Sequence, residues 1–128
     1  MNKVIPKSKI KKKFWKVFSE YIRRRDDGKC FTCSTQKHWK EMDAGHYIPT
    51  SICGEYLHFD ERQVNCQCTS CNRYKHGNLT EYARRLVEKY GGKILEKLYK
   101  IKQEQKTMSA VEMLKRIKKY EDITKKLQ

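Results

Sequence analysis

The sequence lacks any apolar run long enough to cross a membrane. Its N-terminus is charged, but no apolar segment typical of a secretory signal follows. We therefore expect a cytoplasmic protein with no membrane partner. In a reducing cytosol, the six cysteines of the chain favour metal binding over disulfide formation.

Apolar side chains are also scarce, because only 38% of the 128 residues are hydrophobic and 35% are charged. The length fits a single domain, residues 1–128, but this composition argues against a large conventional core. A bound metal would supply part of the missing stability, since its affinity adds to the folding free energy when only the folded chain forms the site.

Acidic residues are few relative to basic ones. Fifteen aspartates and glutamates stand against 30 lysines and arginines, which gives a formal net charge of +15. Such an excess indicates a polyanionic partner, most simply nucleic acid, because lysines and arginines that neutralise phosphates release bound counterions. A basic surface without a specific partner is the alternative.

Two Cys-x-x-Cys motifs, which flank residues 34–67, are the strongest feature that the sequence does contain. Each motif can turn two thiolates toward one ion, and together they provide the four ligands of a tetrahedral structural zinc site, Cys30, Cys33, Cys68 and Cys71. Cys66 could compete as a ligand, although a Cys-x-Cys spacing closes less well around one ion. Cys53 is expected to be a small buried or loop side chain.

Helices are predicted on both sides of these motifs. Residues 8–25 carry apolar side chains at three- and four-residue spacing, with Ser8 as N-cap, and the opposite face is strongly basic. Residues 78–128 should form further helices, two of which begin with capping boxes, at Asn78 with Glu81 and at Ser109 with Glu112. These C-terminal helices could pack on the rest of the chain or pair with a second copy.

Between the outer helices, residues 30–77 are predicted to form a zinc-bound unit of two strands and a helix. Residues 43–48 and 63–67 should be the strands, and residues 34–42 and 50–62 the connections between regular elements. The short helix should contain Asn72 at or near its start and end at His76-Gly77. The fold class is therefore α+β.

Three side chains in this unit have the chemistry of a metal-dependent nuclease. Asp43 offers a carboxylate and Asn72 an amide oxygen to Mg²⁺ or Mn²⁺. A neutral His46 can take a proton from water near pH 7. Asp43 and His46 would leave opposite faces of a regular strand, but Gly45 permits a bulge that could turn them to the same side.

These motifs resemble those of the phage NinG (Rap) recombination protein family. The resemblance is specific over residues 14–92, in the runs Ser19-Glu-Tyr-Ile-Arg-Arg-Arg25, Cys30-Phe-Thr-Cys33, Ala44-Gly-His-Tyr-Ile48, Phe59-Asp-Glu-Arg62, Gln67-Cys-Thr-Ser-Cys-Asn-Arg-Tyr74, Gly77-Asn-Leu79 and Glu81-Tyr82. That family is known for structure-specific cleavage of branched DNA, including Holliday junctions and D-loops. The spacing is also similar to that of phage endonuclease VII, a zinc-stapled junction resolvase.

The resemblance implies a zinc-bound ββα-metal (His-Me finger, HNH-like) centre. By this similarity Asp43 and Asn72 bind the catalytic metal and His46 is the general base. The family usually has an asparagine, five residues before the third cysteine, that orients the base. Here Gln63 stands in its place, so either Gln63 or Asn65 would orient His46. Asn72 replaces the final histidine of HNH proteins, which should weaken metal binding.

We therefore expect a Mg²⁺- or Mn²⁺-dependent endonuclease that cuts branched DNA during phage recombination, in the cytoplasm of the host cell. A homodimer would match the symmetry of a junction. Its predicted phosphate contacts are Lys9, Lys12, Lys13, Lys16, Arg23, Arg73 and Lys75. The alternatives are a non-catalytic zinc module that binds branched or single-stranded nucleic acid, and a non-specific HNH-type DNase.

Overall fold

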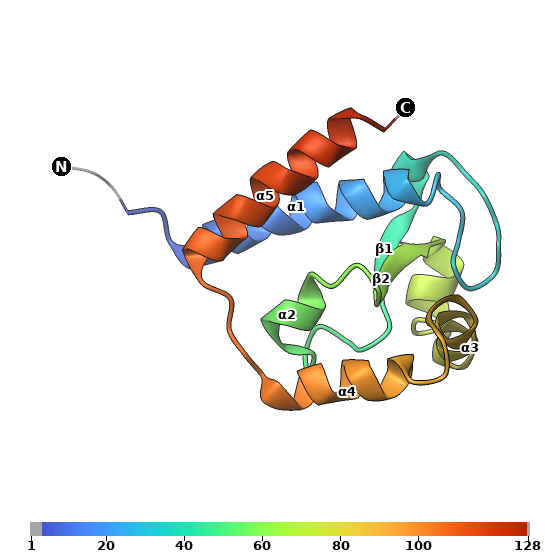
Figure 1. Cartoon of the computed structure of the whole chain (residues 1–128). Helices are drawn as coiled ribbons and strands as arrows, with labels where there is room; N and C mark the ends of the chain where they lie inside the picture. The colour runs from blue at the N-terminus through green and yellow to red at the C-terminus, as the bar shows by residue number, and fades with distance from the viewer. Residues whose placement is uncertain (1–3, 128) are drawn as a thin grey trace.

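Residues 4–127 are described by a computed structural model, in which helices surround a small two-stranded sheet (Figure 1). The described elements are α1 (Lys7–Arg25), the 3-10 turn η1 (Trp39–Glu41), β1 (Asp43–His46), α2 (Gly54–His58), β2 (Val64–Gln67), the π-helical turn η2 (Ser70–Tyr74), α3 (Leu79–Tyr90), α4 (Ile94–Glu104) and α5 (Ala110–Lys125). The predicted α+β class is confirmed at this level.

Helices α1 and α5 lie side by side and form one layer of the molecule (Figure 1). The apolar stripe predicted for the first helix is its buried face, formed by Ile10, Phe14, Phe18, Tyr21 and Ile22. Phe14 stacks on Phe59, with ring centroids 3.8 Å apart, and α5 adds Met113, Ile117 and Tyr120 to the same cluster. Of the two arrangements left open for the last helix, packing on the same chain is therefore observed.

Strands β1 and β2 pair antiparallel, from Asp43 opposite Gln67 to His46 opposite Val64. Alternate side chains leave opposite faces of the sheet. One face, with Ala44 and Val64, packs against the α1–α5 cluster, and the other faces η2 and α3. Both predicted strands are present, and each is shorter than predicted by one or two residues.

A second apolar cluster lies between α2, α3 and α4, and consists of Ile48, Cys53, Leu57, Tyr82, Leu86, Ile94 and Leu98. Residues 50–62 were predicted to be an irregular connection, but they include the short helix α2. This helix forms because Leu57 can be buried completely against the second cluster. The cluster also holds α4 on the far side of the sheet from α1 (Figure 1).

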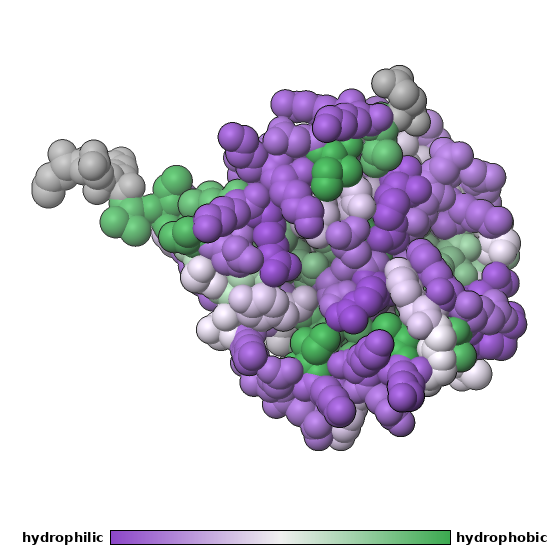
Figure 2. Space-filling view, viewed as in Figure 1, coloured by the Kyte–Doolittle hydropathy of each residue, from purple (hydrophilic) through white to green (hydrophobic). Residues whose placement is uncertain are grey.

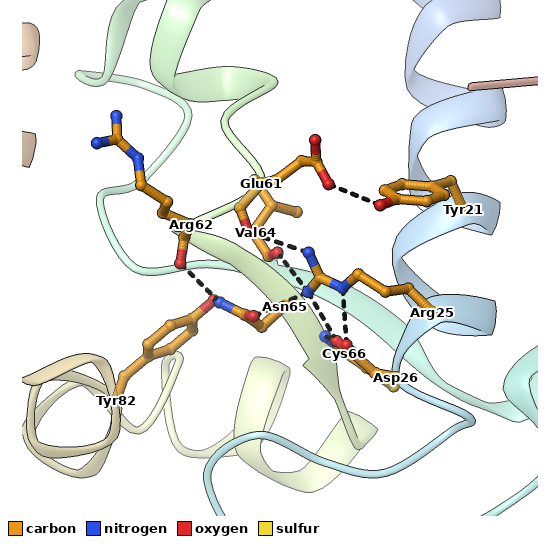
Figure 3. A network of polar contacts seen from close by, with 9 residues as sticks. All are labelled: Tyr21, Arg25, Asp26, Glu61, Arg62, Val64, Asn65, Cys66 and Tyr82. Atoms are coloured by element: carbon orange, nitrogen blue, oxygen red, sulfur yellow. Dashed lines mark hydrogen bonds and ion pairs between the residues drawn. The ribbon is translucent and has the colours of Figure 1, made fainter. Parts of the chain in front are cut away.

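A polar network joins α1 to β2 and α3 (Figure 3). Arg25, at the end of α1, pairs with Asp26 at 2.8 Å and donates to Oδ1 of Asn65 at 2.9 Å. The amide of Asn65 donates to Oη of Tyr82 at 3.0 Å, and the N–H of Cys66 donates to the Asp26 carboxylate at 2.9 Å. Because these partly or fully buried groups satisfy one another, the network fixes β2 relative to both helices.

Two of the predicted helix caps are absent from the described helices. Ser8 lies inside the first turn of α1, which begins one residue earlier. Asn78 precedes α3 in a left-handed conformation, with φ of 50°, and its amide donates to Sγ of Cys71 instead of capping the helix. Ser109 does cap α5, because its hydroxyl accepts the N–H of Glu112 at 3.1 Å.

The face of the molecule in Figure 2 is dominated by hydrophilic side chains, with small hydrophobic patches between them. No helix within residues 4–127 is both long enough and apolar enough to cross a bilayer.

Candidate metal centre and the residues around it

Four cysteines from separate segments meet at one point. Cys30 and Cys33 lie in the turn after α1, Cys68 follows β2, and Cys71 lies in η2. Their sulfur atoms are all within 4.8 Å of one another, and those of Cys33 and Cys68 are 3.6 Å apart. Sulfurs bound to one tetrahedral zinc ion are about 3.8 Å apart. The predicted ligand set can therefore hold a metal such as zinc.

Hydrogen bonds support this cluster. The N–H of Cys71 lies 3.4 Å from Sγ of Cys68, and the amide of Asn78 lies 3.7 Å from Sγ of Cys71. The turn that carries the first two cysteines closes through the N–H of Cys30, which donates to the carbonyl of Thr35 at 2.8 Å. N–H donors stabilise thiolates, so the chain provides the outer partners that a metal–thiolate cluster needs.

The two remaining cysteines lie outside the group of four. Cys66 is fully buried in β2, and burial, aided by the charge of Asp26, raises the pKa of its thiol to about 12. Its sulfur is not among the four that lie within 4.8 Å of one another, in agreement with the prediction that Cys66 would not replace Cys68. Cys53 belongs to the second apolar cluster, as expected for a small buried side chain.

Asp43 and Asn72 lie next to each other, at the start of β1 and directly after the fourth cysteine. Nδ2 of Asn72 donates to Oδ2 of Asp43 at 3.1 Å, and Nε of Arg73 lies 3.3 Å from the same oxygen. The Arg73 side chain is 67% exposed, so this ion pair is weak and can open at little cost. A carboxylate and an amide thus meet at the surface, and both groups suit a hard divalent cation.

Gly45 faces the same side of the sheet as Asp43. A Cβ atom at this position would lie 1.8 Å from Oε1 of Gln67 and 2.9 Å from Oδ1 of Asn72. Both amide oxygens therefore point at the space that a side chain at residue 45 would occupy. Gln67 is fully buried, and its Oε1 has no hydrogen-bond partner among residues 4–127. An unpaired buried oxygen is costly, so the arrangement favours a further group at this point.

His46 leaves the opposite face of β1. The two strands pair residue for residue, so the prediction of a bulge at Gly45 that turns Asp43 and His46 to one side is wrong. Regular pairing prevails because both faces of the sheet are covered. The imidazole of His46 stacks on Trp15 of α1, with ring centroids 5.0 Å apart.

The backbone fixes the tautomer of His46. Its Nε2 lies 2.9 Å from the carbonyl oxygen of His58, and a carbonyl can only accept, so Nε2 donates and Nδ1 keeps a free lone pair. Burial lowers the pKa of His46, although the hydrogen bond to His58 partly offsets the effect. His46 is therefore neutral near pH 7, with Nδ1 able to accept a proton.

Among residues 4–127, no hydrogen bond joins Gln63 or Asn65 to the His46 ring, so the prediction that one of them orients the base directly is wrong. Gln63 instead ties the two ends of a loop, because its Oε1 accepts the N–H of Ile48 at 2.7 Å and its Nε2 donates to the carbonyl of Leu57 at 2.6 Å. This loop ends at the carbonyl that fixes His46, so Gln63 acts on the imidazole only indirectly. Asn65 belongs to the network of Figure 3.

The predicted phosphate contacts fall into two groups. Six of the seven are exposed, namely Lys9, Lys12, Lys13 and Lys16 of α1, and Arg73 and Lys75 beside Asp43. Arg23 differs, because its Nε donates to the carbonyl of Ser19 at 3.1 Å and its guanidinium lies 5.1 Å from the ring centroid of Trp39. This half-buried arginine holds η1 against α1 and is less accessible to a phosphate than the other six, so its DNA contact stays a prediction.

Three residues that shape the site were not predicted to belong to it: Trp15, His58 and Gln67. Helical spacing places Trp15 next to the core stripe but does not show that it covers an imidazole. Gln67 directly precedes the third cysteine, and His58 directly precedes the Phe59 motif. Their position next to these motifs was the only feature of the sequence that pointed to the site. The contacts themselves depend on strand pairing and on the loop after β1.

Comparison with known proteins gives the family context. The model of a family described as the bacteriophage lambda NinG protein matches residues 1–128. The NinG protein of Salmonella phage P22 is 39% identical over 87 residues, which cover 67% of this chain and 42% of the relative. The NinG protein of Escherichia phage lambda is 34% identical over 94 residues, 73% of this chain and 45% of the relative. The chain thus spans less than half the length of these relatives. No solved structure matches it.

Proposed function

Since the chain belongs to the family of the bacteriophage lambda NinG protein, we propose that it is a metal-dependent endonuclease that cuts branched DNA, such as Holliday junctions and D-loops. One observation carries the proposal: Asp43 and Asn72 meet, 3.1 Å apart, on a strand–loop–strand–turn unit that a four-cysteine cluster joins together. We interpret this unit as a ββα-metal centre of the His-Me finger type.

The four cysteines would hold one structural zinc ion. Four protein thiolates complete a tetrahedron and leave no position for substrate or water. The ion would join the turn after α1 to the end of β2 and to η2, the segment that carries Asn72. Its role is therefore to keep Asn72 opposite Asp43.

Asp43 and Asn72 would hold a second, catalytic cation, with waters and a phosphate as its remaining ligands. Bound Mg²⁺ or Mn²⁺ would neutralise the phosphate and stabilise the departing oxygen. Arg73, which now pairs with Asp43, would be free to move to the same phosphate. With one carboxylate and one neutral amide, this pair should bind the cation more weakly than two carboxylates would.

His46 is the proposed general base, and Nδ1 is the atom that takes the proton from the attacking water. The hydrogen bond from Nε2 to the backbone fixes the ring, and the lowered pKa keeps it neutral. Asp43 and His46 lie on opposite faces of β1, but within residues 4–127 a strand pairs with β1 on one edge only. A phosphate across the other edge can be approached from both faces.

Branched DNA and a homodimer complete the proposal. The net charge of +15 and the exposed lysines of α1 support a polyanion with several arms. The preference for branched substrates rests on the family resemblance, and a two-fold dimer would match the two strands that a junction offers for cutting.

The test is cleavage of a labelled synthetic four-way junction beside a linear duplex of the same sequence. We expect cleavage of the junction with Mg²⁺ or Mn²⁺, little cleavage of the duplex, and none with EDTA. Asp43→Ala should abolish cleavage while DNA binding and zinc content persist. Cleavage that persists in EDTA, or in the Asp43 variant, would overturn the proposed site. Equal cleavage of both substrates would indicate a non-specific HNH-type DNase.

A non-catalytic zinc module that binds branched or single-stranded nucleic acid is the second candidate. The position of His46 favours it, because the imidazole is covered by Trp15 and separated from Asp43 by the strand itself. In that case the same assay would give retention of the junction in a gel without cleavage in any metal.

A further inference from the structure

The orientation of the Gln67 amide is fixed by two donated hydrogen bonds. Nε2 donates to Oγ1 of Thr32 at 3.0 Å and to the carbonyl of Gly77 at 2.9 Å. A flipped amide would place Oε1 against the Gly77 carbonyl, where two acceptors repel each other. The amide nitrogen therefore faces Thr32 and Gly77, and Oε1 must face the other way.

In that direction lie Gly45 and the amide oxygen of Asn72. Oε1 of Gln67 and Oδ1 of Asn72 both lie close to the position that a Cβ atom of residue 45 would occupy. The Asp43 carboxylate lies next to Asn72. Oε1 is completely buried and has no partner among residues 4–127. Three neighbouring side-chain oxygens, one of them buried without a donor, are an environment suited to a cation.

We infer that Gln67 is a third protein ligand of the cation held by Asp43 and Asn72, and that Gly45 is required because a Cβ atom at this position would displace the Gln67 oxygen from the site. The inference takes the proposed cation at Asp43 and Asn72 as its premise. A third oxygen compensates in part for the neutral Asn72, since Mg²⁺ and Mn²⁺ bind more tightly when more preorganised oxygens replace water. The buried position also fixes the oxygen before the cation arrives.

Gly45 is required for steric reasons and not for its backbone conformation. This glycine lies in a regular strand and does not have a positive φ, so an alanine could adopt the same backbone conformation. What an alanine could not do is share the space with the two amide oxygens, because its Cβ would overlap Oε1 of Gln67. Gly92 is a matched control, because its φ is not positive and a Cβ there meets nothing within 4 Å.

The experiment is a titration with Mn²⁺ alone, followed by the EPR signal of free Mn²⁺, so that it requires neither DNA nor activity. The variants are Gln67→Met, which removes the oxygen at similar volume, Gly45→Ala, and the controls Gly92→Ala and Gln67→Glu. Zinc content is measured on each sample to confirm that the four-cysteine cluster is intact. We expect Gln67→Met and Gly45→Ala to weaken Mn²⁺ binding roughly tenfold or more. Gly92→Ala should bind as wild type does, and Gln67→Glu at least as tightly.

The outcomes separate this inference from the proposed function. If Asp43→Ala abolishes Mn²⁺ binding but zinc-loaded Gln67→Met binds as wild type does, the cation site stands and Gln67 is not a ligand; a buried water then satisfies its oxygen. If Gln67→Met loses zinc, its Mn²⁺ affinity no longer reports on the cation site, and Gly45→Ala becomes the test. Wild-type Mn²⁺ affinity in Gly45→Ala would then overturn the inference. If wild type binds no Mn²⁺ in an Asp43-dependent way, both the inference and the proposed catalytic cation are wrong.

Discussion

The two faces of β1 differ more than a four-residue strand would lead one to expect. On one face, Asp43 and Gly45 border a set of oxygens that suits a cation. On the other, Ala44 packs on the α1–α5 core and His46 stacks under Trp15. The strand thus separates a charged, oxygen-rich environment from an apolar one in which the imidazole of His46 is largely shielded from water. The carboxylate of Asp43 and the imidazole of His46 therefore lie in different environments although they are only a few residues apart.

The oxygen-lined face depends on η2, and the largest effect should come from removing the metal that anchors this segment. Cys68→Ser should lose zinc and unfold or aggregate, because structural zinc contributes about 10–16 kcal/mol to small zinc-folded units while a domain is stable by only about 5–15 kcal/mol. Metal analysis and circular dichroism would measure both losses.

Cys66→Ser is the matched control for that change. Cys66 is as deeply buried but lies outside the group of four sulfurs, so this variant should keep its zinc and lose about 1–2 kcal/mol of stability at most. A wild-type protein that contains no zinc and melts identically with and without a chelator would contradict the prediction.

The imidazole face should show its role in the rate of cleavage rather than in binding. His46→Ala should lower junction cleavage by roughly two to four orders of magnitude, the usual contribution of a general base. Junction affinity should be nearly unchanged, because no phosphate contact is lost. His58→Ala keeps the backbone carbonyl that holds His46, so its cleavage should stay close to wild type. If both variants cleave at the wild-type rate, the base lies elsewhere.

The outer face of α1 sharpens the comparison, since its lysines should act through charge alone. Replacement of Lys12, Lys13 and Lys16 by glutamine should flatten the slope of log affinity against log salt by roughly two to three units. Linear and branched DNA should weaken together, because phosphate contacts do not distinguish sequences. Binding titrations between low and physiological salt would measure the slope.

Three exposed lysines on or beside α4 are the control for this charge change: Lys93, Lys97 and Lys100. They lie on the other side of the sheet from α1 (Figure 1). The same substitutions there should leave the salt slope close to that of wild type. Equal flattening by both triple variants would mean that the chain binds DNA without a preferred face.

The smallest effect should be a pH dependence that arises on the imidazole face. Burial lowers the pKa of His58 to about 4, with smaller contributions from His46 and Lys11. The unfolded chain, with an ordinary pKa near 6.5, binds more protons between these values, so stability falls as the pH drops from about 6.5 toward 4. After allowance for partial exposure, His58 should account for about 1–2 kcal/mol of that loss.

Urea unfolding at pH 7 and pH 5 would test this effect. His58→Gln should lose less stability than wild type over the same interval, because it has no group that titrates there. Identical losses in the two proteins would mean that other groups, such as the metal-binding cysteines, carry the acid sensitivity.

Local pattern was enough to predict much of the fold. Spacing alone predicted α1, the two strands and further helices after residue 78, because apolar periodicity acts over a few residues. Spacing also predicted that the four cysteines form one metal site, since two Cys-x-x-Cys turns can converge on one ion. The predicted caps at Ser8 and Asn78 were wrong because capping depends on more than local spacing. Contacts with other segments of the same chain determine which backbone groups at a helix end need a partner.

The order of residues specifies which chemical groups the protein has: four thiolates at metal-binding spacing, an aspartate, a histidine, an asparagine and a large positive charge. Which of these groups meet depends on how the segments pack. Regular pairing of β1 with β2 placed Asp43 beside Asn72 and turned His46 toward Trp15, and it brought Gln67 opposite a glycine. Side-chain direction along a strand depends on register, and register is set by packing on both faces of the sheet, which no single segment of sequence contains.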